Sequence, residues 1–153
     1  MVLRQTRHVQ WRLATVEDAR LLAEMNHQLI AHEGHRNPMN VAELEQRMRG
    51  WLSADYQAVL FYQEDKVVAY ALFRDDESGR THLRQFFVVL PLRRQGVGRE
   101  AFRLLRTEVI PTDRRIVVDV LTGNTAARSF WSANGFRDYA ITLELDAAED
   151  SRN

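Results

Sequence analysis

The sequence contains no cysteine, which excludes a disulfide framework, a thiol nucleophile and a cysteine-based zinc site. Long apolar runs are also absent, and no stretch approaches the roughly 18 residues that a membrane-spanning helix needs. Residues 1–10 hold no apolar segment of the kind found in a signal peptide. We therefore expect no membrane partner and a cytoplasmic location.

An excess of either charge is lacking as well. The chain has 21 Lys and Arg against 21 Asp and Glu, so its formal net charge is zero. Because such a chain has no global attraction to polyanions, we expect no nucleic-acid partner. Its 153 residues, 45% of them hydrophobic, predict a single domain over 1–153, with a core at about 9–146 and a polar tail at 147–153.

The turn at residues 90–99 is the most informative stretch. An apolar run at 86–89 is typical of a strand, and apolar residues at helical spacing follow from Val97 to Val109. Gly96 and Gly98 lie at the start of that helix. The first backbone N–H groups of a helix are unpaired, and the positive end of the helix dipole is located there. Three arginines add positive charge: Arg93, Arg94 and Arg99. This combination predicts a phosphate or pyrophosphate site.

Other interpretations of this turn fit less well. A Walker loop would end in Gly-Lys-Ser/Thr, which the chain lacks. A dinucleotide fingerprint would place a third glycine at position 101, where the chain has Ala101. The alternative without a ligand is an ordinary tight turn whose arginines are solvated.

Hydrophobic periodicity predicts an α/β (α+β) fold with the order β-α-α-β-β-β-α-β-α-β. Thr15 and Asp18 fit a capping box before the first helix, and residues 32–38 are expected to form a polar loop. Strands are expected at 9–14, 57–62, 66–73, 82–89, 116–121 and 136–145. Helices are expected from about 19 to Gly34, at 41–52, at 97–109, and from Asn124 to Gly135.

Two motifs carry a resemblance to a known family. Residues 93–98 read Arg-x-x-Gly-x-Gly, and residues 124–136 read Asn-Thr-Ala-Ala-Arg-Ser-Phe-Trp-Ser-Ala-Asn-Gly-Phe. They resemble the Q/R-x-x-G-x-G/A and N-x-x-A-x-x-F-Y-x-x-x-G-F blocks of the GNAT superfamily, the acyl-CoA-dependent N-acetyltransferases. The resemblance covers roughly residues 9–146. It implies a mixed, mostly antiparallel twisted sheet flanked by about four helices, with acetyl-CoA as co-substrate and no metal.

The resemblance also implies where acetyl-CoA binds. The backbone of 87–89 is expected to pair with the pantetheine amides as an added strand would, and the N–H groups of 94–99 to hold the pyrophosphate. Asn124 either contacts the pantetheine arm or only caps the helix that it precedes. The expected contacts are Phe87, Val88, Val89, Arg93, Arg94, Gln95, Gly96, Val97, Gly98, Arg99 and Asn124.

The family's reaction is direct attack of a neutral amine on the thioester carbonyl, often with an acid that protonates the leaving thiolate. The usual acid is a tyrosine, but its position in the second motif is occupied by Trp131, whose indole N–H supplies no proton. Three readings stay open: Tyr139 serves instead, the thiolate leaves without an acid, or the protein binds acyl-CoA without turnover. Trp131 itself is expected to be core or the wall of the substrate pocket.

Gln85 is a candidate on the predicted strand 82–89. By strand alternation it shares a face with Leu83 and Phe87, while His82, Arg84 and Phe86 form the other face. Gln85 cannot act as a base, but it could position a water molecule.

Two carboxylates complete the candidates. Asp119 is the only charge in the apolar run 116–121, where it would share a face with Val117 and Leu121. Because an unpaired buried carboxylate is costly, it either pairs with an arginine or faces the substrate amine. Glu33 is a candidate partner for a cationic substrate. His32 and His35 beside it could suggest a metal site, but the chain has no H-E-x-x-H motif and no obvious third ligand, so a solvated loop is expected there.

The sequence therefore predicts an acyl-CoA-dependent N-acetyltransferase that acts on a primary amine by direct attack in a ternary complex. The alternative is a non-catalytic acyl-CoA-binding or regulatory module on the same fold. A nucleotide-binding domain is the third hypothesis, and only the glycine turn supports it. Since dimers are common in the superfamily, a homodimer is also considered.

Overall fold

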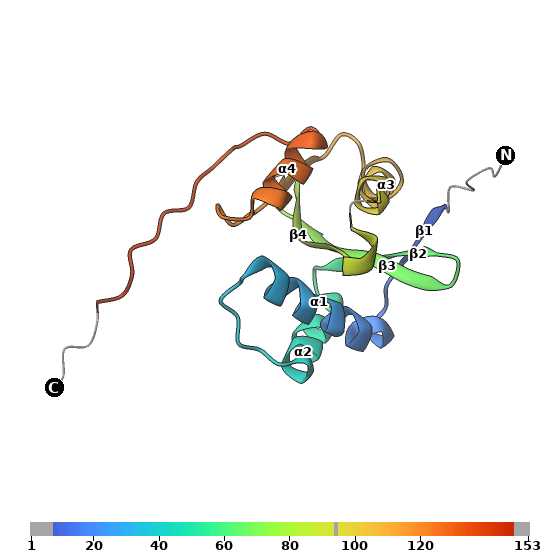
Figure 1. Cartoon of the computed structure of the whole chain (residues 1–153). Helices are drawn as coiled ribbons and strands as arrows, with labels where there is room; N and C mark the ends of the chain where they lie inside the picture. Colours follow the sequence, from blue (N-terminus) through green and yellow to red (C-terminus); the bar gives the residue numbers. More distant parts are fainter. Residues whose placement is uncertain (1–7, 94, 149–153) are drawn as a thin grey trace. The chain divides into compact units, whose positions relative to one another are not determined.

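The computed structural model describes residues 8–93 and 95–148 (Figure 1). The chain divides into two compact units, Met1–Leu121 and Thr122–Asn153, and each is described by itself. The predicted single domain over 1–153 therefore stays a prediction. No helix in the described part of the chain is both long and apolar enough to cross a membrane.

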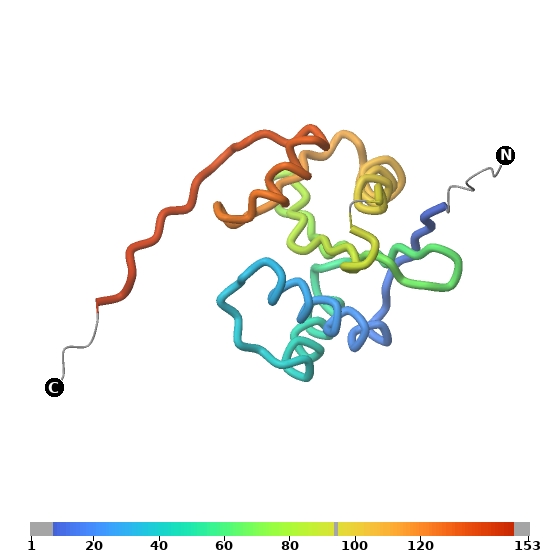
Figure 2. The backbone as a smooth tube through the Cα atoms, viewed as in Figure 1, coloured from blue at the N-terminus to red at the C-terminus, as the bar shows by residue number. Residues whose placement is uncertain are grey.

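A five-stranded sheet with the order β1-β2-β3-β4-β5 forms the centre of the first unit. Its first three pairings are antiparallel, and β4 pairs with β5 in parallel. The strands are β1 (Val9–Leu13), β2 (Gln57–Gln63), β3 (Lys66–Asp75), β4 (Arg80–Val88) and β5 (Arg115–Val118). The prediction of a mixed, mostly antiparallel sheet is confirmed. Figure 2 follows the predicted hairpin from β2 to β3, which turns at Glu64 with a positive φ of 56°.

Three helices pack on this sheet in two layers. On one face, α1 (Ala19–Glu33) and α2 (Val41–Leu52) lie side by side, and the core there includes Leu22, Met48, Tyr70, Leu72 and Phe87. On the other face lies α3 (Val97–Leu104), where Phe102 meets Phe86 with ring centroids 6.4 Å apart. Neighbouring residues of β4 thus supply two cores, as strand alternation requires.

The N-terminus of α1 is held by Asp18, within a short 3₁₀ turn at Val16–Asp18. The carboxylate accepts two bonds from Arg12, both 2.9 Å, and one of 2.8 Å from the Thr15 backbone N–H. The bonds from Arg12, and then that from Thr15, hold the pKa of Asp18 below its ordinary value. The predicted capping box is confirmed, and it ties the helix to β1.

We expect Asp18→Asn to destabilise the fold by roughly 1 kcal/mol at pH 7, because the amide cannot reproduce the paired carboxylate. The pKa of Asp18 is depressed, so this contribution is present at neutral pH and is lost as pH falls below the ordinary value of 3.8. Urea unfolding at pH 7 and pH 3 measures it, and the difference between the two proteins should be smaller at the lower pH. Glu24→Gln, which breaks an exposed pair with Arg20, is the control that should change little. An equal loss at both pH values would contradict the electrostatic account.

The second unit contains α4 (Thr125–Ala133). The side chain of Asn124 caps it by accepting a bond from the Ala127 N–H at 3.1 Å, and Gly135 follows with a positive φ of 92°. The predicted closing strand at 136–145 is wrong, because residues 136–148 form neither helix nor strand. The apolar side chains of Ile141, Leu143 and Leu145 are exposed. Alternation shows which residues share a face but does not supply the strand with which they pair.

Two other elements differ from the sequence prediction, one in length and one in helix type. The strand expected at 116–121 stops at Val118, because the pairing of β5 with β4 ends at Val118 and Leu83. The third helix keeps α-geometry only to Leu104 and continues as a π-turn over Leu105–Val109, with Ile110 N–H bonded to the Leu105 carbonyl at 2.8 Å. The first helix ends at Gly34 as predicted, so His32 and Glu33, which were also assigned to the polar loop, belong to α1.

Candidate functional site

The glycine turn joins β4 to α3 as predicted. A 3₁₀ turn at Leu90–Leu92 leaves the strand, and Gly96 precedes α3 with φ 80° and ψ 0°. That left-handed conformation favours glycine, and a Cβ built there would meet nothing within 4 Å. No described side chain caps the helix, and the Gly96 carbonyl accepts a bond from the Glu100 N–H. The N–H groups of α3 that precede Glu100 have no partner within the helix. Unpaired N–H groups at the start of a helix can bind an anion, so they indicate an anion site.

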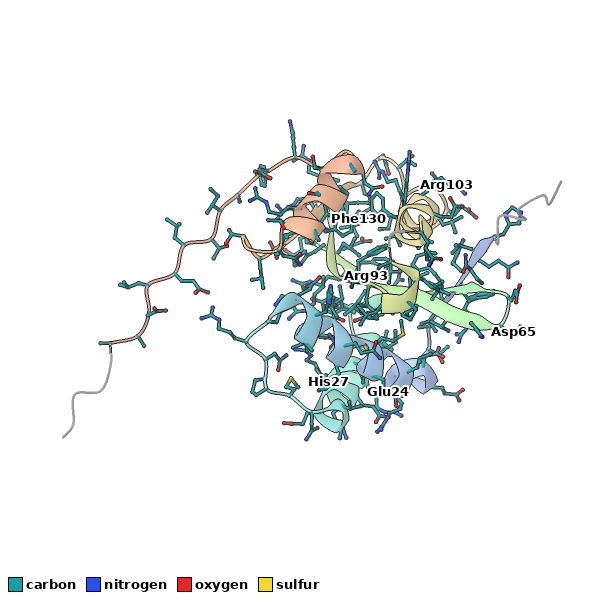
Figure 3. The ribbon with its side chains drawn as sticks, in the orientation of Figure 1. Glu24, His27, Asp65, Arg93, Arg103 and Phe130 are labelled. Atoms are coloured by element: carbon teal, nitrogen blue, oxygen red, sulfur yellow. The ribbon has the colours of Figure 1, made fainter. Side chains whose placement is uncertain are left out.

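Side chains of the turn are partly used to hold the turn itself. Arg93, labelled in Figure 3, donates from Nε to the Val88 carbonyl at 3.1 Å, and its guanidinium lies 5.4 Å from the Phe87 ring centroid. Burial lowers the pKa of Arg93, and the charge of Glu33 acts in the opposite direction. Gln95 donates to the Pro91 carbonyl at 3.2 Å. Arg94, also predicted here, lies outside the described residues.

Within the first unit, the part of β4 beside this turn is paired on one side only. Pairing with β5 ends at Leu83, whereas pairing with β3 continues to Val88. Residues 84–88 therefore present one backbone edge that no strand of the described first unit covers. Such an edge can accept an extended ligand through backbone hydrogen bonds. The side chain of Phe87 is buried against Tyr70, so it belongs to the core while its backbone lies at this edge.

A bulge in β4 corrects the predicted alternation. The register with β3 shifts between Leu72 and Phe73, whose partners are Gln85 and Leu83, so Arg84 is the extra residue. A bulge redirects side chains. Arg84 consequently does not share a face with Phe86: its guanidinium lies 4.7 Å from the Trp51 ring centroid, on the side of α2. Sequence alternation cannot show this inserted residue.

Gln85 is buried and held in place. Its Oε1 accepts a bond of 2.9 Å from the Tyr70 hydroxyl, which fixes the orientation of the amide. Burial raises the pKa of Tyr70 well above its usual value, and the charge of Glu33 adds to the effect. Tyr70 is thus a neutral donor, and Gln85 presents its Nε2 group.

Asp119 lies just after β5 rather than inside it, which corrects the predicted placement on a strand face with Val117 and Leu121. Its side chain is 92% exposed, so the carboxylate has no desolvation cost that a partner would have to offset. The partner is not an arginine: Oδ2 lies 3.1 Å from Nε2 of His82 on β4. The structure thus brings together a carboxylate and an imidazole at the point where β4 and β5 separate.

Glu33 is the last residue of α1 and contacts His35, with Oε2 2.8 Å from Nε2. Its charge raises the pKa of both Arg93 and Tyr70. Across residues 8–93 and 95–148, no three His, Asp or Glu side chains form a group that could hold a metal ion.

Three of the predicted residues belong to the second unit. Trp131 packs against Phe136, with ring centroids 5.0 Å apart, and against Phe130 at 4.8 Å. Tyr139 is exposed, and Asn124 caps α4. Because the two units are described separately, their placement beside the glycine turn stays a prediction.

An arginine–aromatic cluster was not predicted from the sequence. It comprises Arg47 and Trp51 of α2, Tyr56, Arg74 of β3 and Arg84 of β4. The Arg47 and Arg84 guanidinium carbons lie 4.4 and 4.7 Å from the Trp51 ring centroid, and that of Arg74 lies 5.7 Å from the Tyr56 centroid. The Trp51 and Tyr56 rings are 5.2 Å apart. Only the spacing of Arg47 and Trp51, one helical turn apart, was visible in the sequence.

Comparison with known proteins gives a consistent result. Residues 17–136 match the model of the acetyltransferase (GNAT) family. A comparison with curated proteins finds no match.

Solved structures share the fold. The aminoglycoside N-acetyltransferase AAC(6')-Iy in complex with CoA is 13% identical, with a TM-score of 0.73 over 95% of this chain and 99% of that one. A predicted acetyltransferase from Clostridium acetobutylicum, solved with acetyl-CoA, is 16% identical, with a TM-score of 0.71 over 95% and 100%. The ribosomal-protein-alanine N-acetyltransferase from Brucella melitensis biovar Abortus 2308 is 13% identical, with a TM-score of 0.70 over 92% and 100%. At these identities the likeness concerns the fold alone.

Proposed function

The chain belongs to the acetyltransferase (GNAT) family, and from this we propose that it transfers an acetyl group from acetyl-CoA to a primary amine. The observation that carries the proposal is the juxtaposition of the glycine turn before α3 with the open edge of β4. The first provides N–H groups for a pyrophosphate. The second provides backbone groups for the pantetheine amides. The solved relatives with bound CoA or acetyl-CoA support this assignment of the ligand.

The reaction that we propose is direct attack in a ternary complex. The neutral amine nitrogen attacks the thioester carbon, the C–N bond forms, and the C–S bond breaks as CoA leaves with the sulfur. The amine loses one proton and the thiolate gains one, so the site has to accept and return a proton. The carbonyl oxygen becomes more negative during attack, and a hydrogen-bond donor beside it lowers the barrier.

We assign the proton acceptor to the pair of His82 and Asp119. Imidazole is the commonest general base near neutral pH, and a bonded carboxylate orients it and stabilises its charged form. Gln85 is assigned a positioning role, because the Tyr70 hydroxyl fixes its amide while Nε2 is left to contact a water or the acceptor. Glu33 is a counter-ion for an approaching ammonium group. Tyr139 stays a candidate for the acid that protonates the thiolate.

A non-catalytic acyl-CoA-binding module is the second candidate function. It is favoured by Trp131, which occupies the position of the family's usual tyrosine acid and packs against two phenylalanines. Such a protein would keep the glycine turn and would lack turnover.

Ligand-dependent melting separates these functions from nucleotide binding. We expect CoA and acetyl-CoA, each at about 100 times its Kd, to stabilise the protein by roughly 2.7 kcal/mol, and NAD to have no effect. Thiol release from acetyl-CoA across a panel of primary amines then distinguishes an enzyme from a binding module. Stabilisation by NAD but not by CoA would contradict both candidate functions, whereas CoA binding without thiol release would favour the second.

A further inference from the structure

Three arginines of the arginine–aromatic cluster carry charge that the described residues do not balance. Arg49, Arg80 and Arg114 each have a carboxylate partner. By contrast, no ion pair in the described part of the chain involves Arg47, Arg74 or Arg84. The chain is neutral overall, so three such arginines around the Trp51 and Tyr56 rings form a local excess of positive charge.

Donors of the cluster are also left unused. Arg47 donates from Nη2 to the Asn26 side chain at 3.1 Å, but its Nε is buried without a hydrogen-bond partner. Arg84 donates one bond of 3.3 Å, to the Tyr56 hydroxyl. A buried N–H donor without a hydrogen-bond partner costs free energy. A guanidinium group without an ion-pair partner can bind a carboxylate through two parallel hydrogen bonds. Burial lowers the pKa of Arg47, and the like charge of Arg84 adds to this, so an anion would relieve both costs.

The cluster lies on the acceptor side of the proposed site. If the pyrophosphate binds at the glycine turn and the pantetheine along 87–89, the acetyl group points back along β4. Arg84 lies four residues before Val88, about 13 Å along a strand. The bulge turns it toward α2, beside the buried Gln85. A small acceptor can therefore place its amine near the thioester and its other end on the cluster.

We propose that the arginine–aromatic cluster binds a carboxylate carried by the acceptor, so that the substrates are small amino acids with a free amine rather than plain amines. This inference rests on the proposed acetyl transfer. Arg84 and Arg47 supply the charged donors, and Trp51 holds the two guanidinium groups in position by cation–π contact. These residues bind and select the acceptor and take no part in proton transfer.

Matched acceptors test the charge directly. An ω-amino acid series of increasing chain length is compared with the corresponding amides, in acetyl transfer and in calorimetric binding to the CoA-loaded protein. We expect at least one acid to exceed its amide by about 10- to 100-fold in kcat/KM, through KM, and in affinity. The ω-aminophosphonates form a third arm. A phosphonate preferred over every carboxylate, or acids no better than amides, would overturn the proposal.

Variants assign the preference to the cluster. Arg84→Gln should reduce the acid-to-amide ratio toward one, and so should Arg47→Lys, which keeps a charge but loses the planar fork. Arg49→Gln, on the same helix but paired with Glu45, is the control that keeps the ratio. An unchanged ratio in both folded cluster variants would overturn the proposal. The calorimetric arm does not depend on turnover, so a protein that acetylates nothing would refute the proposed function while the carboxylate preference is still decided.

Discussion

CoA affinity should fall by roughly 100-fold or more when Gly96 is replaced with aspartate, while the protein stays folded. The side chain would project a carboxylate toward the N–H groups at the start of α3, where it would compete with and repel the pyrophosphate. The fold should survive because a Cβ at Gly96 meets nothing within 4 Å. Aspartate is also among the residues that tolerate a positive φ. Titration calorimetry with CoA measures the effect.

Gly79→Asp is the matched control. Gly79 has a φ of 83° and equally open surroundings, but it lies in the turn that precedes β4, at the other end of that strand. Both substitutions therefore place a non-glycine residue at a positive φ, but only Gly96→Asp should lower the affinity for CoA. Gly96→Asn separates charge from bulk and should lose less affinity than the aspartate variant. A folded Gly96→Asp protein with unchanged CoA affinity would refute the assignment of this turn.

Local signals account for the parts of the fold that were predicted well. The cap at Asp18, the glycine at position 34 with its left-handed conformation, and the asparagine cap before α4 each fix a helix end within a few residues of chain. The glycine turn belongs to the same class, because a strand, two glycines and an apolar helical stripe are all encoded within residues 86–109. The sequence therefore predicted the turn, and the pyrophosphate expected there stays a prediction.

The errors concern pairing between distant segments. The bulge at Arg84 arises from the register with β3, and the early end of β5 arises from its separation from β4. The alternation of apolar and polar residues along one strand shows neither the bulge nor the early end of β5. The arginine–aromatic cluster likewise joins α2, β3, β4 and the chain before β2, so no single stretch of sequence contains it. The pairing of Asp119 with His82 spans 37 positions and was missed for the same reason.

Turnover should fall on the order of 10²-fold in Asp119→Asn if the His82–Asp119 pair accepts the proton from the amine. The amide keeps the shape of the side chain but cannot stabilise a protonated imidazole. CoA affinity should not change, because the glycine turn is formed by other residues. The melting temperature should also stay close to that of the wild type, since exposed ion pairs contribute little to stability and this carboxylate is 92% exposed. Single-turnover acetyl transfer and thermal melting on one preparation measure both quantities.

A double-mutant cycle decides whether the two residues act as a unit. His82→Gln should cost about as much turnover as Asp119→Asn, and the double variant should cost little more than either one, because residues that act together are not additive. Asp138→Asn is the control: it removes an ion-paired carboxylate that is 88% exposed, in the second unit, and should leave turnover unchanged. If Asp119→Asn lowers the melting temperature but does not change turnover per folded molecule, the pair is structural and Asp119 is not a residue of the proposed site. If both single variants slow the reaction but their effects add, each residue contributes separately, and the proposal that His82 and Asp119 act as a unit is refuted.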